Sequence, residues 1–106
     1  MKRYDIRWAA LDPALGAEMA KTRPVVIVSL DALNERLPTF TVCPLTTILH
    51  PAWRSRLACT VAGREAEIAV DQIRTLSKAR LGRKAGALSG EMARRLRRLI
   101  TEMYGE

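Results

Sequence analysis

Apolar residues in this chain fall mainly into short runs with the spacing of β-strands. Residues 4–11 alternate between apolar and polar positions, with Ile6 and Trp8 on one side, and this period of two predicts a strand. Residues 25–30, which follow Pro24, form a continuous apolar run. Such a run predicts a central strand that is buried on both faces.

Further strands are expected at residues 39–43, 56–61 and 66–71, where apolar and β-branched side chains are frequent. We expect the first of these to end at Pro44, because proline lacks the N–H that a strand ladder uses. A hairpin-like connection near residues 62–64 joins the other two.

A C-terminal helix is the clearest element of the chain. Ser89 is a good N-cap, Glu91 places negative charge at the positive end of the helix dipole, and Gly105 ends the helix. Its apolar stripe has helical spacing and consists of Met92, Leu96, Leu99, Ile100 and Met103. Outside the stripe lie Arg94, Arg95, Arg97 and Arg98. Short helical turns are also expected at residues 31–34 and after Ser77. The pattern predicts a mainly β fold with a C-terminal helix (α+β), built as a small, strongly bent sheet or barrel.

Length and charge narrow the class of protein. At 106 residues the chain is long enough for one compact domain, 1–106, and too short for two. Its 18 Lys and Arg residues exceed its 11 Asp and Glu residues, which gives a net charge of +7. This balance indicates a polyanionic substrate or partner, although a basic surface that only aids solubility is the alternative. No apolar run approaches the roughly 20 residues of a membrane span, so no membrane partner is expected.

Cysteine and histidine usage argues against a metal or another cofactor. Cys43 and Cys59 lack metal-binding spacing, and His50 is the single histidine, with no clustered carboxylates around it. The N-terminus carries no signal peptide, so the expected compartment is the reducing cytoplasm. There the two cysteines are expected to be buried hydrophobic residues and not a disulfide.

Polar clusters stand at the ends of the strand-like runs, at residues 22–24, 44–47 and 71–75. Together they supply arginine, threonine, glutamine and a carboxylate on a strongly basic protein. These side chains have the chemistry needed to bind and cut a phosphodiester without a metal.

Most of the chain resembles one known family, the MazF/PemK toxins of bacterial toxin–antitoxin pairs. The resemblance rests on several motifs that occur in the family's order. They are Asp5-Ile6-Arg7-Trp8 with Leu11-Asp12-Pro13, Gly16-Ala17-Glu18 with Thr22-Arg23-Pro24-Val25-Val26, Val42-Cys43-Pro44-Leu45-Thr46, Asp71-Gln72-Ile73-Arg74-Thr75, and Leu81 to Gly86 with Leu88.

This resemblance implies a homodimer with a barrel-like fold related to SH3 barrels and shared with CcdB toxins. It also implies ribosome-independent, sequence-selective cleavage of single-stranded RNA and neutralisation by an acidic antitoxin. Arg23 and Thr46 match the family's principal catalytic positions. The family's loop commonly reads Gly-Ser-Glu-Gln-Gly-Gly, whereas residues 16–21 here read Gly-Ala-Glu-Met-Ala-Lys. Two lost glycines are expected to stiffen the loop and to affect cleavage sequence and rate.

RNA can be cut without a metal because its own 2′-hydroxyl can serve as the nucleophile. The protein then has to supply a base, an acid and cations around the phosphate. Arg23 suits the phosphate, since a guanidinium stays protonated and presents a planar fork to two oxygens. Glu18 is the first candidate for the base and Asp71 the second. The alternatives are an exposed loop residue for Glu18 and a turn cap for Asp71.

Several other side chains are candidates for RNA binding. Thr46 is expected to donate a hydrogen bond to the phosphate and Thr47 to a base or sugar, although both are common turn residues. Gln72 is suited to a base edge and Arg74 to a phosphate, the alternative for Arg74 being an ion pair with Asp71 or Asp31. The full set of RNA-binding candidates is Lys21, Thr47, Trp53, Asp71, Gln72 and Arg74. Trp53 can stack on a base or pack against the protein itself.

The sequence is also compatible with two other functions. One is a non-enzymatic, CcdB-like toxin that binds DNA gyrase, and the other is a catalytically inactive nucleic-acid-binding domain. Arg23 and Thr46 favour the nuclease, whereas the altered loop at residues 16–21 is the reason to consider an inactive domain. The helix arginines form a solvated face in one interpretation and add affinity for RNA or antitoxin in another.

Overall fold

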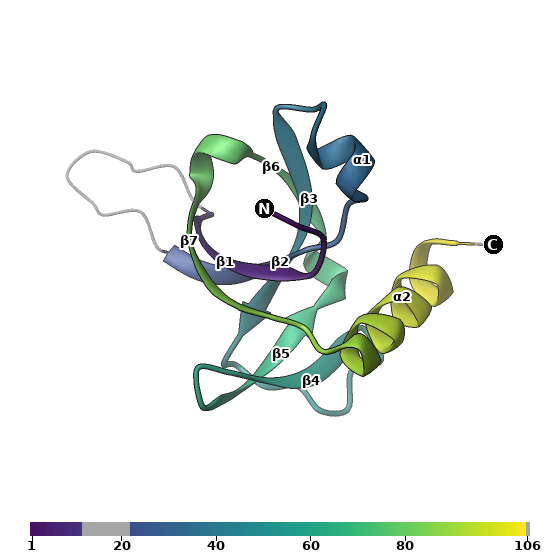
Figure 1. Cartoon of the computed structure of the whole chain (residues 1–106). Coiled ribbons are helices and arrows are strands. Elements are labelled where there is room, and N and C mark those ends of the chain that lie inside the picture. The colour runs from purple at the N-terminus through teal and green to yellow at the C-terminus, as the bar shows by residue number, and fades with distance from the viewer. Residues whose placement is uncertain (12–21, 106) are drawn as a thin grey trace.

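The computed structural model describes residues 1–11 and 22–105, which form a curled β-sheet with one long helix packed beside it (Figure 1). In chain order the elements are β1 (Asp5–Ala10), β2 (Thr22–Ile27), α1 (Asp31–Asn34), β3 (Thr39–Thr46), β4 (Arg56–Val61), β5 (Arg64–Ala69), the 3-10 turn η1 (Val70–Gln72), β6 (Arg74–Ser77), the 3-10 turn η2 (Lys78–Arg80), β7 (Leu81–Ala87) and α2 (Gly90–Tyr104).

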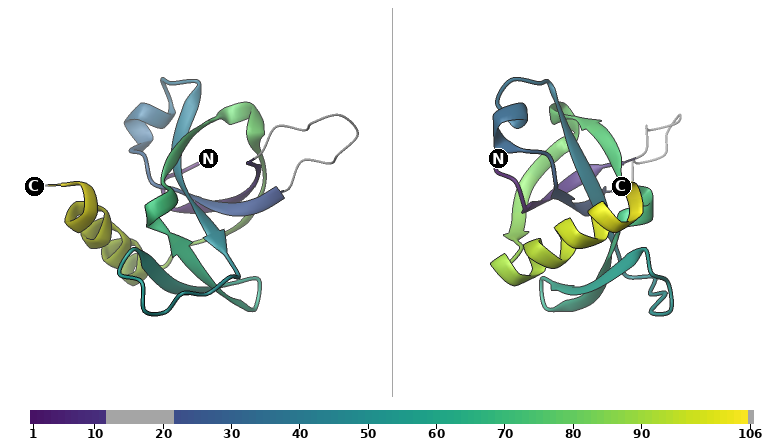
Figure 2. Two further views of the ribbon diagram at one scale, coloured as in Figure 1. Left: turned by 180° about the vertical axis from the view of Figure 1, so that it is seen from behind. Right: turned by 90° about the vertical axis from the view of Figure 1, so that its right-hand side faces the viewer.

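The strands form one antiparallel sheet in the order β4-β5-β3-β2-β1-β7, and β6 pairs with β3 beside this path. β3 changes partner along its length. Its first half pairs with β6 and its last two residues pair with β5. Figure 2 shows from two further sides that the sheet curls around itself. The predicted mainly β, barrel-like fold with a C-terminal helix is therefore confirmed.

Two hydrophobic clusters explain why β2 is apolar at every position after Pro24. Val26 joins the cluster that α2 covers, together with Leu96 of that helix. Val25 and Ile27 point to the other face of the strand and join the cluster that includes Phe40. These three residues of β2 are fully buried, as the continuous apolar run predicted, but the strand runs from Thr22 to Ile27 and not over residues 25–30.

The long helix α2 follows the sequence prediction closely. Its N-cap is Ser89, whose Oγ accepts a hydrogen bond from the Met92 N–H at 3.2 Å. Leu96 is fully buried, and the rest of the predicted stripe packs against the same cluster. Ala93, which the stripe omitted, is also buried. The four arginines outside the stripe are exposed. No described helix is both long and apolar enough to cross a membrane.

The ends of some strands differ from the sequence prediction. β3 does not stop at Pro44 but continues to Thr46. On one side of β3, Pro44 lies between the residues that pair with β6 and those that pair with β5, so it has no partner there, while on the other side it is opposite Val25 of β2. A proline is best tolerated where one side of the strand needs no ladder bond. The strand expected at 66–71 begins at Arg64 and ends at Ala69. Asp71 therefore lies on the turn η1 and not on a strand.

A tight hairpin joins β4 to β5, as predicted. Ala62 and Gly63 both have positive φ values, 52° and 77°, which is the backbone that the two central residues of a type I′ hairpin turn require. This turn fixes the register of the two strands from Arg56 opposite Ala69 to Val61 opposite Arg64. The register decides which charged side chains of the hairpin meet.

The cysteines form no disulfide. Cys43 is fully buried and Cys59 is half-buried, in agreement with the expectation for small hydrophobic residues. Burial raises the pKa of the Cys43 thiol to about 12, and the nearby Asp71 carboxylate adds to the shift. Cys43 is consequently a protonated thiol at neutral pH and not a nucleophile.

Candidate active site

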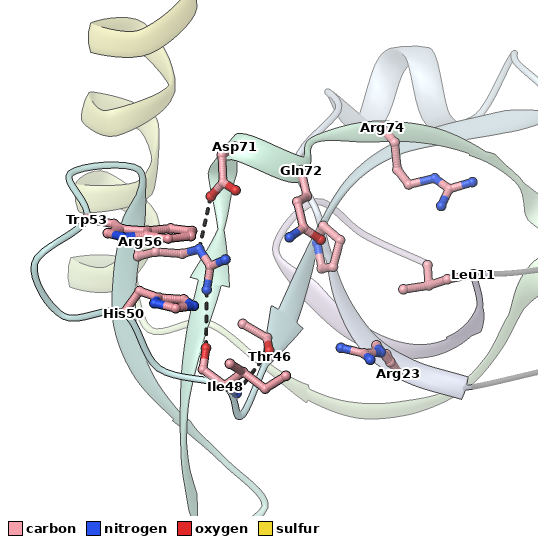
Figure 3. A pocket seen from close by; sticks show the side chains of 11 residues that line it. Leu11, Arg23, Thr46, Ile48, His50, Trp53, Arg56, Asp71, Gln72 and Arg74 are labelled. Atoms are coloured by element: carbon pink, nitrogen blue, oxygen red, sulfur yellow. Dashed lines mark hydrogen bonds and ion pairs between the residues drawn. The ribbon is translucent and has the colours of Figure 1, made fainter.

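A cleft of about 680 Å³ opens where the start of β2, the end of β3 and the turn η1 come close together (Figure 3). Its lining includes most of the residues that the sequence singled out, namely Arg23, Thr46, Trp53, Asp71, Gln72 and Arg74. Sequence reasoning did not assign a role to the other lining residues, which are Leu11, Pro44, Ile48, His50 and Arg56.

Thr47, another candidate from the sequence, does not line this cleft. Thr47 lines a neighbouring, more apolar groove of about 330 Å³, which shares Arg23 and Thr46 with the cleft. Glu18 and Lys21 lie outside the described residues.

Arg23 and Thr46 come together through the pairing of β2 with β3. Val25 is opposite Pro44 in this ladder, and the same antiparallel register continued by two residues brings Arg23 across from Thr46. Thr46 is only 9% exposed, and its Oγ1 accepts a hydrogen bond from the Ile48 N–H at 3.0 Å. The threonine is therefore a turn residue, as the alternative interpretation held, but its hydroxyl proton remains available to donate into the cleft.

Arg56 is the centre of a buried ion cluster in the cleft wall. Its side chain is 6% exposed, and its Nε donates to Asp71 Oδ1 at 3.0 Å. Its Nη1 donates to the Ile48 carbonyl at 3.3 Å and to Glu67 Oε1 at 3.4 Å. Glu67, 4% exposed, also accepts the His50 N–H at 2.9 Å. One guanidinium thus fixes both the Asp71 carboxylate and the loop after β3.

This cluster escaped sequence reasoning, although the chain carries a signal for it. The hairpin register places Arg56 opposite Ala69 and Glu67 opposite Ala58, so the two charges are diagonal neighbours on one face. That signal becomes visible only when the exact turn of the hairpin is known.

Two aromatic rings stand on the same wall. The rings of His50 and Trp53 are stacked, with centroids 3.8 Å apart and planes within 6°. The Arg56 guanidinium carbon lies 4.8 Å from the centroid of the Trp53 ring. Trp53 thus packs on its own domain, yet 47% of it stays exposed.

The charges of the cleft are unequally neutralised. Asp71 pairs with Arg56 and not with Arg74, while an oxygen of Asp31 accepts the backbone N–H of Arg3. The ion pair proposed as the alternative for Arg74 is therefore wrong. In residues 1–11 and 22–105, Arg23 and Arg74 form no ion pair, whereas two carboxylates compensate Arg56. In the view of Figure 3, Arg23 and Arg74 lie on the side of the cleft opposite His50 and Trp53.

Taken together, the side chains of the cleft are suited to a phosphodiester. Two cations, a hydroxyl, an amide and a carboxylate meet in a space large enough for several nucleotide groups. Within the described parts of the chain, no three His, Cys, Asp or Glu side chains gather as they do around a bound metal ion.

The curled β-sheet and its cationic cleft define a small, basic β-barrel-like protein, and comparison with known proteins identifies its family. Residues 2–104 match the model described as "PemK-like, MazF-like toxin of type II toxin-antitoxin system". The chain belongs to this family.

Two relatives with more than 30% identity agree with the assignment, and a solved structure shares the fold. The chain is 33% identical over 100 residues to Endoribonuclease EndoA of Bacillus subtilis, covering 87% of this chain and 84% of EndoA. It is 32% identical over 113 residues to Endoribonuclease MazF of Staphylococcus saprophyticus, covering 99% and 92% of the two chains. A mycobacterial endoribonuclease, solved in complex with its cognate antitoxin, has a TM-score of 0.80 at 21% identity, covering 99% of this chain and 95% of its own.

Proposed function

We propose that this chain is the toxin of a type II toxin–antitoxin pair and an endoribonuclease that cuts single-stranded RNA without a metal ion. The observation that carries the proposal is the meeting of Arg23, Thr46 and Asp71 in one cleft. Family membership and relatives named as endoribonucleases support the activity.

Cleavage in this proposal uses the 2′-hydroxyl of the RNA as the nucleophile. The 2′-oxygen bonds to phosphorus while the bond from phosphorus to the 5′-oxygen breaks. The base takes the proton of the 2′-hydroxyl, and the leaving 5′-oxygen takes a proton from water or from an acid in the cleft, which leaves a cyclic phosphate and a 5′-hydroxyl. Arg23 and the Thr46 hydroxyl stabilise the charge on the phosphate oxygens. Glu18 is the first candidate to take the 2′ proton, and Asp71 is the second.

The remaining cleft residues hold the strand in this proposal. Arg74 and Lys21 bind phosphates, Gln72 and Asp71 contact base edges, and Thr47 in the adjoining groove contacts a base or sugar. Trp53 contributes to RNA binding on the opposite wall. Selectivity for sequence follows from these contacts, because phosphate contacts alone are the same for every sequence.

An acidic antitoxin is the partner that this proposal requires. The similar mycobacterial endoribonuclease was solved with its cognate antitoxin. We infer that an acidic segment lies across Arg23 and blocks the cleft, and that the toxin acts as a homodimer in the cytoplasm. A CcdB-like gyrase poison and an inactive nucleic-acid-binding domain are less favoured, because the characterised relatives are endoribonucleases.

The test is incubation of the purified protein with single-stranded RNA and with single-stranded DNA, both in EDTA. Cleavage of RNA alone, with a 5′-hydroxyl on the downstream product, is the expected result. Activity that is lost in EDTA and restored by magnesium contradicts the metal-free mechanism. Binding without cleavage of either strand points instead to the inactive domain.

A further inference from the structure

The stacked pair of His50 and Trp53 is the largest aromatic surface in the wall of the cleft. Both rings line the cleft, and Trp53 is among the large apolar side chains that remain exposed. An exposed indole in the wall of a cationic cleft is accessible to a ligand that enters the cleft.

Backbone contacts hold the pair in place before any ligand arrives. The Trp53 N–H donates to the His50 carbonyl at 2.9 Å, and the Arg56 N–H donates to the Trp53 carbonyl at 3.3 Å. Glu67, buried beneath, accepts the His50 N–H. The Arg56 side chain contacts the Trp53 ring from within the same ion cluster. The loop is therefore anchored at both rings, so little ordering entropy is lost when a ligand binds.

We propose that His50 and Trp53 form a nucleobase-stacking subsite that binds one unpaired base of the RNA next to the bond that is cut. This inference rests on the proposed function, because it places the base on the same strand whose phosphate contacts Arg23.

A base is the occupant that the surroundings favour. The pair shares one cleft with Arg23 and Arg74, which attract a polyanion, and its flat rings match the π-face that every base carries. Arg56 lies over the indole and holds it in place as part of the buried ion cluster. The subsite therefore contributes affinity and position, and any base preference comes from the neighbouring polar groups.

An abasic scan tests the subsite directly. The probe is a single-stranded oligonucleotide of a sequence that the protein cleaves, with a 2′-deoxy sugar at the cut position so that binding is measured without cleavage. Bases are removed one at a time, and each dissociation constant is measured by fluorescence anisotropy for wild type, Trp53→Ala and His50→Ala. Leu49→Ala is the matched control, because Leu49 is exposed on the same loop but does not line the cleft.

In wild type, one abasic position is expected to weaken binding by about five- to a hundredfold, the range that base–aromatic stacking supplies. That penalty should nearly vanish in Trp53→Ala, shrink at the same position in His50→Ala, and persist in Leu49→Ala. Trp53→Phe, which keeps a ring, should retain most of it.

The proposal is wrong if removing each base weakens binding equally in wild type and in Trp53→Ala. It is also wrong if His50→Ala and Trp53→Ala reduce the loss of binding affinity at different positions of the oligonucleotide. Failure of the proposed function has a different signature, since the wild-type protein then cleaves no RNA at all. In that case the scan is run on any single strand that binds, and it still decides whether Trp53 stacks on a base.

Discussion

Replacing Arg56 by methionine should destabilise the protein far more than its position near the surface of a hairpin suggests. Methionine keeps most of the stem volume, so the change chiefly removes the charge. Glu67 is then left 4% exposed, with the His50 N–H as its remaining hydrogen-bond donor. Removing one partner of a buried ion pair typically costs about 3–5 kcal/mol, because the other charge stays desolvated. Asp71 adds less, since its side chain is 30% exposed and can be hydrated.

Urea unfolding at a fixed protein concentration measures this cost. The double variant Arg56→Met/Glu67→Gln removes the stranded charge but keeps an acceptor for His50, so it should regain a large part of the lost stability. Arg54→Met is the matched control, because Arg54 is on the same loop and pairs with Glu102 while its side chain is 88% exposed. It should change stability by no more than about 0.5 kcal/mol. A single variant within about 1 kcal/mol of wild type, or a double variant no more stable than the single one, refutes the reasoning.

Other predictions concern the chemistry of the cleft and of the core. Arg23→Ala and Thr46→Ala should each lower RNA cleavage by about a hundredfold or more with the fold intact. Arg83→Ala is the control and should not lower it, because Arg83 is exposed and lies outside the cleft. Near-full activity of Arg23→Ala would show that the active site has been assigned wrongly. An RNA with a 2′-deoxy sugar at the cut position should bind and stay uncut, and efficient cleavage of it excludes 2′-hydroxyl attack. The Cys43 thiol has a pKa of about 12 and is therefore protonated at pH 8, so iodoacetamide at that pH should modify Cys43 only after unfolding, as measured by mass spectrometry. Rapid modification of Cys43 itself in the native protein contradicts its burial.

The parts of the fold that the sequence predicts well are those with strong local signals. β2 and α2 each carry a hydrophobic pattern that only one kind of element satisfies, and Ser89 marks the start of the helix. The end of β3 was mispredicted because the effect of Pro44 depends on its ladder partners, which belong to distant segments. Asp71 was placed on a strand for a similar reason.

The candidate site was predictable to the extent that its residues end recognisable strands. Arg23 and Thr46 were selected through the family resemblance, and the pairing of β2 with β3 then explains why they are neighbours. The role of Arg56 was not predictable, because its partners Glu67 and Asp71 are 11 and 15 residues away and meet it only through the hairpin and the turn that follows. Glu18 and Lys21 lie outside the described residues, so their placement stays a prediction.

The buried ion cluster itself bears on function. A buried charge pair rarely stabilises a fold more than apolar residues of the same volume, because both ions lose their hydration. Stability therefore gives little reason for Arg56 and Glu67 to occupy this position. Geometry gives a better one, since the same guanidinium holds Asp71 on the turn η1 and supports the ring of Trp53 on the loop after β3. We infer that the cluster serves to orient the two halves of one cleft wall. A variant that replaces it by apolar residues is then expected to fold and yet to position RNA poorly.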